Sequence, residues 1–190
     1  MSDNIKIAVD AMGGENSPKK VIEGIIINHK ENSNILYNIF GDLEKIEPLL
    51  PKNYNKKIFN IVNTKNKILD TDSPLSAAKK GKDTSMWLAI QSVKNKESDV
   101  AISAGNTGAL FVISKLNLRM IDNIDKPALS ALWPNKNNFN IVLDLGLNIE
   151  CNEKNLIDFS IMGSSLFKSL YPNEIATVAL LNIGSEELKG

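Results

Sequence analysis

The sequence predicts an α/β protein whose parallel sheet is covered by helices on both faces. Short apolar segments without polar alternation recur at 5–9, 35–40, 58–62 and 99–103, and amphipathic segments separate them. Strands that are buried on both faces read as continuous apolar runs, and parallel neighbours need a crossover between them. The alternation of the two kinds of segment therefore favours a parallel sheet between layers of helices.

The first strand, 5–9, leads into the first predicted helix. Ser17 has a side chain suited to cap a helix, and Pro18 is suited to the first helical position. We therefore expect the helix to start at these two residues. Its buried stripe is expected to consist of Val21, Ile22, Ile25 and Ile26.

Two further strands and two helix starts follow in the first half of the chain. Strands are expected at 35–40, where Gly41 ends the run, and at 58–62, with a short helix between them. Ser73 and Pro74 form a second cap signal, and a helix is expected to restart at Asp83 or Thr84. The apolar face of this helix would carry Met86, Ile90 and Val93.

The second half continues the alternation. A long helix is predicted where apolar residues recur in helical phase, at Leu156, Phe159, Met162, Leu166 and Leu170. A strongly apolar strand is expected after it. In order, the predicted elements are a strand at 99–103, a helix at 109–120, strands at 128–133 and 140–145, a helix at 153–170 and a strand at 175–183.

The loop after the strand at 99–103 is the most informative candidate site. Two glycines bracket it and permit a tight turn with close approach to a ligand. It opens a helix, where free N–H groups and the helix dipole favour an anion. The loop thus predicts a cradle for phosphate or carboxylate, although a tight turn with polar caps fits equally well. Its candidate residues are Ser103, Gly105, Asn106, Thr107 and Gly108.

The loop after the first strand is a second candidate. Asp10 stands where the strand ends, and Gly13 and Gly14 permit unusual backbone angles and close approach to a ligand. An acid at this place could orient a nucleophile or bind a metal, or it could simply cap an Asx turn. The spacing differs from the dinucleotide-binding fingerprint, because G-x-G-x-x-G is absent.

Two later loops also follow predicted strands. Asp144 begins the loop at 144–148, and the run at 184–189 can open an anion-binding helix. Ligands in open parallel sheets bind at the carboxyl ends of strands, so the four loops are expected to lie near one another. The candidate residues in the last loop are Ser185, Glu186 and Lys189.

Composition disfavours several function classes. Basic and acidic residues balance at 22 each, which argues against a nucleic-acid-binding surface. One cysteine, Cys151, cannot form a disulfide within the chain, which fits a reducing cytoplasm. With one histidine, His29, no cluster suggests a metal site. No apolar run is long enough to span a bilayer, and no signal peptide is expected.

Several motifs together resemble the bacterial phosphate acyltransferases of phospholipid synthesis. VDAMGG and SAGNTGAL are specific to that family, and the resemblance covers nearly the whole chain. We expect one α/β domain over residues 1–190 that is shorter at its C-terminus than the family. The matching strings, in order, are KIAVDAMGGE, DTSMWLAIQSV, DVAISAGNTGAL, DKPALSALWP, IVLDLG, DFSIMGSSLF and VALLNIGSEELKG.

The resemblance implies a Rossmann-like α/β/α sandwich with a mostly parallel sheet, similar to the isocitrate/isopropylmalate dehydrogenase-like and phosphotransacetylase folds. It implies transfer of an acyl group from acyl carrier protein to inorganic phosphate, without a metal or organic cofactor. It also implies a cytoplasmic homodimer and peripheral association of the full-length family with the inner membrane face. The acyl phosphate would pass to a membrane glycerol-phosphate acyltransferase.

Roles follow for the candidate residues. Residues 105–108 would hold phosphate, with Asn106 acting in catalysis. Ser103 and Asp10 would orient that loop, and Asp10 could accept a proton. Lys189, matched to the Lys-Gly of the family loop, would neutralise developing charge. Two alternatives stay open: a non-catalytic remnant that only dimerises or binds carrier protein, and a dehydrogenase-like relative.

Overall fold

The computed structural model describes residues 4–136 and 138–181. Its contacts divide the chain into two compact units, Met1–Arg119 and Met120–Gly190, and each is described here by itself. That residues 1–190 form a single domain stays a prediction. Within the described residues, no helix is both long enough and apolar enough to cross a membrane.

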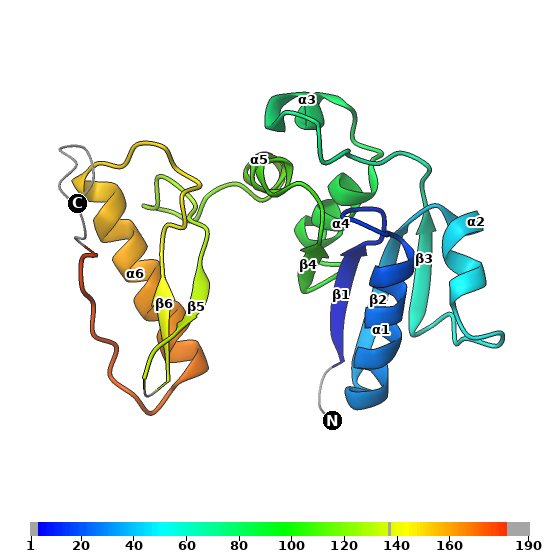
Figure 1. Ribbon diagram of the computed structural model, residues 1–190, viewed down its shortest axis with the longest axis horizontal. Helices are drawn as coiled ribbons and strands as arrows, with labels where there is room; N and C mark the ends of the chain where they lie inside the picture. The colour runs from blue at the N-terminus through cyan, green and yellow to red at the C-terminus, as the bar shows by residue number, and fades with distance from the viewer. Residues whose placement is uncertain (1–3, 137, 182–190) are drawn as a thin grey trace. The chain divides into compact units, whose positions relative to one another are not determined.

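The first unit contains a fully parallel four-stranded sheet (Figure 1). The spatial order of its strands is β3-β2-β1-β4, so the fourth strand lies beside the first. The predicted α/β class and parallel pairing are confirmed, because the sheet is parallel and helices flank it. The strands are β1 (Ile5–Asp10), β2 (Ile35–Gly41), β3 (Phe59–Asn63) and β4 (Val100–Ser103).

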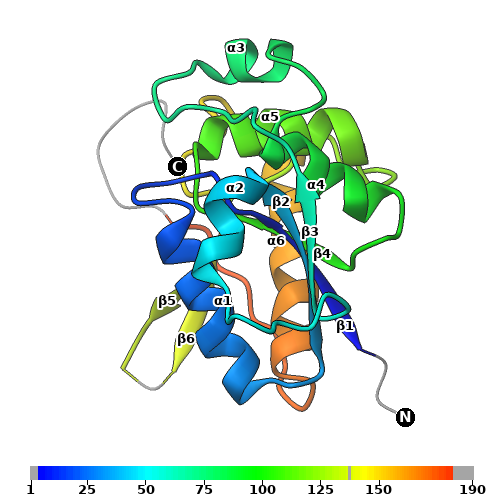
Figure 2. The same ribbon diagram turned by 90° about the vertical axis from the view of Figure 1, so that its right-hand side faces the viewer.

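Helices cover both faces of this sheet. Figure 2 shows α1 and α4 on opposite sides of the strands. The helical elements are α1 (Lys19–Glu31), α2 (Leu43–Ile46), the 3₁₀ turn η1 (Glu47–Leu49), α3 (Pro74–Lys79), α4 (Ser85–Lys94) and α5 (Thr107–Leu118).

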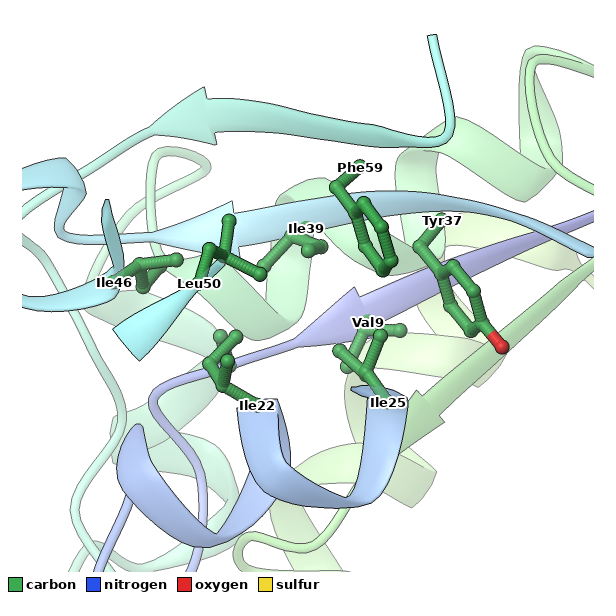
Figure 3. Packing of buried hydrophobic residues seen from close by; sticks show 9 residues of the cluster. Val9, Ile22, Ile25, Tyr37, Ile39, Ile46, Leu50 and Phe59 are labelled. Atoms are coloured by element: carbon green, nitrogen blue, oxygen red, sulfur yellow. The ribbon is translucent and has the colours of Figure 1, made fainter. Parts of the chain in front are cut away.

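Successive residues of one strand serve the two different layers. On the α1 face, Ile22 and Ile25 pack with Val9 and Ile39 in one buried cluster (Figure 3). On the other face, the neighbouring Ala8 packs with side chains from β2 and α4. Side chains of a strand alternate between faces, so a strand with two apolar faces forms two cores at once. This explains why the apolar runs at 5–9 and 35–40 contain only one polar residue each, Lys6 and Asn38.

The start of α1 differs from the prediction. The helix begins at Lys19, the preceding Pro18 has helical angles, and no side chain caps it. Ser17, the predicted cap, instead donates its hydroxyl to the carbonyl oxygen of Gly13. A serine hydroxyl can bond to a nearby loop carbonyl as well as to a helix N–H, and here the loop contact is the one formed. The prediction at α3 is confirmed, because Ser73 accepts from the N–H of Ser76.

The second unit contains a hairpin and a long helix. Strands β5 (Ala131–Pro134) and β6 (Phe139–Val142) pair antiparallel, and α6 spans Glu153–Leu170 as predicted. The expectation that these two strands continue a parallel sheet is wrong. Only four residues connect them, whereas a parallel crossover needs about a dozen or more.

The strand predicted at 175–183 is not formed in its described part. Residues 175–181 have no regular secondary structure, and residues 182 and 183 lie outside the described residues. Apolar side chains such as Ile175, which is 89% exposed, stand in solvent. High apolar content favours a strand only where another strand can accept its backbone hydrogen bonds, and no described strand pairs with this segment.

Candidate active site

The order of the strands points to one crevice in the first unit. The chain moves from β1 outward through β2 and β3, and then returns to place β4 on the other side of β1. In open parallel sheets, ligands bind outside the carboxyl ends of the two strands where the order reverses in this way. Here those ends are Asp10 and Ser103, which are register partners.

A chain of hydrogen bonds joins the two predicted loops at this point. The Ser103 hydroxyl donates to Asp10 Oδ2 at 2.7 Å and accepts from the N–H of Gly105 at 3.1 Å. The other carboxyl oxygen of Asp10 accepts from the N–H of Met12 at 3.2 Å. Asp10 is only 2% exposed, so these contacts hold it in place at the base of the crevice.

Two glycines let the loops approach closely. A Cβ on Gly13 would stand 2.6 Å from Asp10 Oδ2 and 2.9 Å from the backbone nitrogen of Gly105. Gly14 has a φ of +86°, and a Cβ there would stand 2.5 Å from the carbonyl oxygen of Ala104. Both positions therefore exclude side chains, one by contact alone and one by contact and backbone angle.

Asn106 uses its whole side chain within the protein. Its Oδ1 accepts from the N–H of Ala109 at 3.0 Å and caps α5. Its Nδ2 donates to the carbonyl oxygens of Asp70 and Asp72, at 3.1 and 2.8 Å. An amide nitrogen has two hydrogens, so both are engaged. The side chain therefore ties the loop at 70–72 to the start of α5.

The first turn of α5 keeps backbone donors available. In the described part of the chain, no acceptor is found for the N–H groups of Thr107 and Gly108. Free N–H groups at a helix start bind anions. Gly108 also allows close packing, because a Cβ there would stand 2.7 Å from Pro74 Cγ.

The other predicted site residues lie elsewhere. Asp144 belongs to the second unit, where its carboxylate accepts from the N–H groups of Leu129 at 2.8 Å and Asn148 at 2.7 Å. It thus organises its own turn, and its approach to the first two loops stays a prediction. Ser185, Glu186 and Lys189 lie outside the described residues.

One ion pair stands beside the candidate site. Lys80 Nζ lies 2.5 Å from Asp72 Oδ2, and the N–H of Leu69 donates to the same oxygen at 2.7 Å. The hydrogen bond from Lys80 and then that from Leu69 lower the pKa of Asp72 below its usual range. Asp72 is thereby held as a carboxylate. It lies in the loop at 70–72, whose carbonyl oxygens accept from the Asn106 amide. Among the described residues, no group of three or more metal-ligating side chains is found.

Sequence reasoning missed the contribution of the segment at 70–74. The carbonyls of Asp70 and Asp72 and the ring of Pro74 support the start of α5, although this segment reads only as a loop and a helix start. A backbone carbonyl gives no signal in residue type. The sequence therefore offers no means to find these two acceptors.

The family model described as "Fatty acid synthesis protein" matches residues 5–190 of this chain. The chain belongs to this family. Its candidate crevice is thus formed by residues within the matched region. Relatives named phosphate acyltransferase match along the whole chain, which agrees with the resemblance expected from the motifs.

Three family members illustrate the range of similarity. The phosphate acyltransferase of Pelagibacter ubique is 69% identical over 194 residues, that of Bradyrhizobium diazoefficiens 42% over 192, and that of Paramagnetospirillum magneticum 38% over 191. All three alignments cover 100% of this chain, but they cover 57%, 54% and 54% of the respective relatives. The chain therefore spans little more than half the length of these relatives.

Proposed function

We propose that this chain supplies the phosphate-binding part of an enzyme that transfers an acyl group from acyl carrier protein to inorganic phosphate. The observation that carries the proposal is the crevice between β1 and β4, where free N–H groups of α5 adjoin the linked residues Asp10 and Ser103. The name of the relatives, phosphate acyltransferase, supports phosphate as the acyl acceptor.

The proposed chemistry needs no side-chain nucleophile. A phosphate oxygen attacks the thioester carbonyl, a tetrahedral oxyanion forms, and the carrier thiolate leaves as the acyl phosphate forms. The protein must hold phosphate in line with the carbonyl and stabilise the oxyanion. The loop at 105–108 would hold phosphate through the N–H groups of Thr107 and Gly108, and Asp10 would accept a phosphate proton. Lys189 would offset developing charge.

Asn106 would act by position. Its amide is already engaged, so its contribution would be to aim the N–H groups of Thr107 and Gly108 at the anion. The loops carrying Asp144, Ser185 and Glu186 would contact the acyl carrier substrate. We also propose that the protein works as a cytoplasmic homodimer and passes acyl phosphate to a membrane glycerol-phosphate acyltransferase.

The direct test is acyl phosphate formation from acyl carrier protein thioester and phosphate by the purified chain, followed by mass spectrometry. We expect product that depends on phosphate concentration. A folded sample that binds phosphate without forming product would instead favour a non-catalytic binding role. A folded sample that does neither would contradict the proposal.

Two substitutions at Asn106 test the positioning role. Asn106→Asp keeps the oxygen that caps α5 but loses both donations to the loop at 70–72. Asn106→Ala loses all three contacts and, as a lost cap, costs about 1 kcal/mol of stability. We expect Asn106→Asp to have a higher KM for phosphate than the wild type. We expect Asn106→Ala to have a lower kcat than Asn106→Asp. Equal kinetics for the wild type and both variants would contradict the role.

A further inference from the structure

A groove of about 350 Å³ opens beside the candidate site, entirely within the first unit. It lies between α1 and the strands β1 and β4, and such a volume falls at the small end of ligand pockets. Two of its lining residues, Asp10 and Ala104, belong to the two loops of the crevice. The groove therefore continues directly from the place where phosphate is proposed to bind.

The groove has mostly apolar walls and a polar end near the carboxyl end of β1. Its walls are apolar and include Ile7, Val9, Ile25 and Ile102. The charged and hydroxyl groups of Asp10, Glu15, Ser17 and Lys20 lie near the carboxyl end of β1 and the start of α1. Farther along α1, Asn28 Nδ2 donates to the Tyr37 hydroxyl at 2.7 Å, so this polar pair is already satisfied.

A second feature of the groove is Gly24, which is exposed. It lines the groove from within α1, where glycine destabilises a helix relative to alanine. A Cβ at Gly24 would meet no atom within 4 Å, so contact with the described residues gives no reason for glycine there. The absence of a side chain leaves the groove open at its middle.

We propose that this groove holds the fatty acyl chain of the thioester substrate, with its carbonyl carbon at the Asp10 end. A chain of methylene groups needs no hydrogen-bond partners and fits the apolar walls, whereas an amide-containing arm would leave its polar groups unpaired there. The inference rests on the proposed function for the position of the carbonyl. The side chain of Ile102, which is 51% exposed, would be covered by the bound acyl chain.

The test is a direct binding measurement that requires no turnover. Titration of the intact chain with dodecanoate, and separately with butyrate, is followed by calorimetry for the wild type, Gly24→Leu, Gly24→Ala and Glu23→Leu. Glu23 is exposed on the same helix and does not line the groove, so it is the matched control. We expect Gly24→Leu to weaken dodecanoate binding at least tenfold, Gly24→Ala to weaken it less, and Glu23→Leu to leave it unchanged.

Several outcomes would overturn the inference. One is dodecanoate binding that is absent from the wild type or equal in wild type and both Gly24 variants. Another is a wild-type dimer that Gly24→Leu alone converts to monomer without affecting dodecanoate, because the groove would then be an interface between copies. Loss of dodecanoate binding in Gly24→Leu would support the groove even if no acyl phosphate forms, and in that case the proposed function alone fails. Should Gly24→Leu not fold, Gly24→Ala decides.

Discussion

At the scale of single residues, Ser103 links the two loops of the candidate site. Its hydroxyl donates to the buried Asp10 and accepts from Gly105. Ser103→Ala should lower the free energy of unfolding by about 1.5–3 kcal/mol, because a buried carboxyl group loses a donor. Urea denaturation measures this change. Ser76→Ala, which removes an exposed hydroxyl from α3, should have little effect, and an equal loss in both variants would contradict the assignment.

Glycine-to-alanine changes should act in opposite directions at two positions. Gly13→Ala places a Cβ 2.6 Å from Asp10 Oδ2 and 2.9 Å from a backbone nitrogen, so the loops must separate and stability should fall. Gly24→Ala adds a methyl to open space in α1 and should raise stability by about 0.5–1 kcal/mol. Thermal unfolding of both variants checks the pair. A melting temperature that shifts in the same direction for both would contradict the argument.

At the scale of elements, the local stability of the segment from Leu69 to Lys80 should depend on pH. Asp72 has its pKa lowered by Lys80 first and by the N–H of Leu69 second. Its carboxylate therefore stabilises the fold fully above the unfolded pKa, about 3.9. This contribution is lost as pH falls through the lower folded value. We expect amide exchange in this segment to accelerate in that acidic range.

Two neighbouring substitutions separate this effect from general acid unfolding. Asp72→Asn should make exchange in the segment fast already at neutral pH and remove its acid transition. Asp70→Asn is the matched control, because within the described part of the chain its exposed side chain forms no hydrogen bond or ion pair with Lys80 or Leu69. If Asp70→Asn and Asp72→Asn behave alike, the ion pair does not control the segment.

Element prediction succeeded where local and tertiary signals agree. Strands β1 and β2 bury residues on both faces, and α6 carries a regular apolar spacing, so composition and periodicity lead to the same answer. Prediction failed for the segment at 175–181, whose apolar residues need a neighbouring strand that local sequence does not supply. At the site, Asp10 and Ser103 could be placed at strand ends, but their direct hydrogen bond depends on strand order, which no local pattern encodes.

At the scale of the whole molecule, one feature of the sheet topology accounts for the positions of the candidate site and the groove. Because β4 returns beside β1, the loops at 10–16 and 103–108 meet at the carboxyl edge. The same return places Ile102 of β4 in one groove with residues of α1. Under the two proposals above, phosphate and an acyl chain would bind side by side on one unit, with Asp10 at the boundary.

The return of β4 also leaves an edge that should affect the behaviour of the chain in solution. Among the described residues, β4 pairs with β1 alone, and its Val100 is 44% exposed. An unpaired apolar edge offers backbone groups to a strand of another chain. We therefore expect the chain to self-associate as its concentration rises, in a way that sedimentation velocity can follow.

A charge on this edge should reduce that association. Val100→Lys places a charged side chain on the edge, where it must lose hydration when another strand pairs with β4. Ile27→Lys makes the same kind of change on α1, at a residue 59% exposed that lies on no strand and outside the groove. Because backbone pairing requires the strand edge, Val100→Lys should lower association much more than Ile27→Lys. An equal decrease would mean that general apolar exposure, and not the edge of β4, drives the chains together.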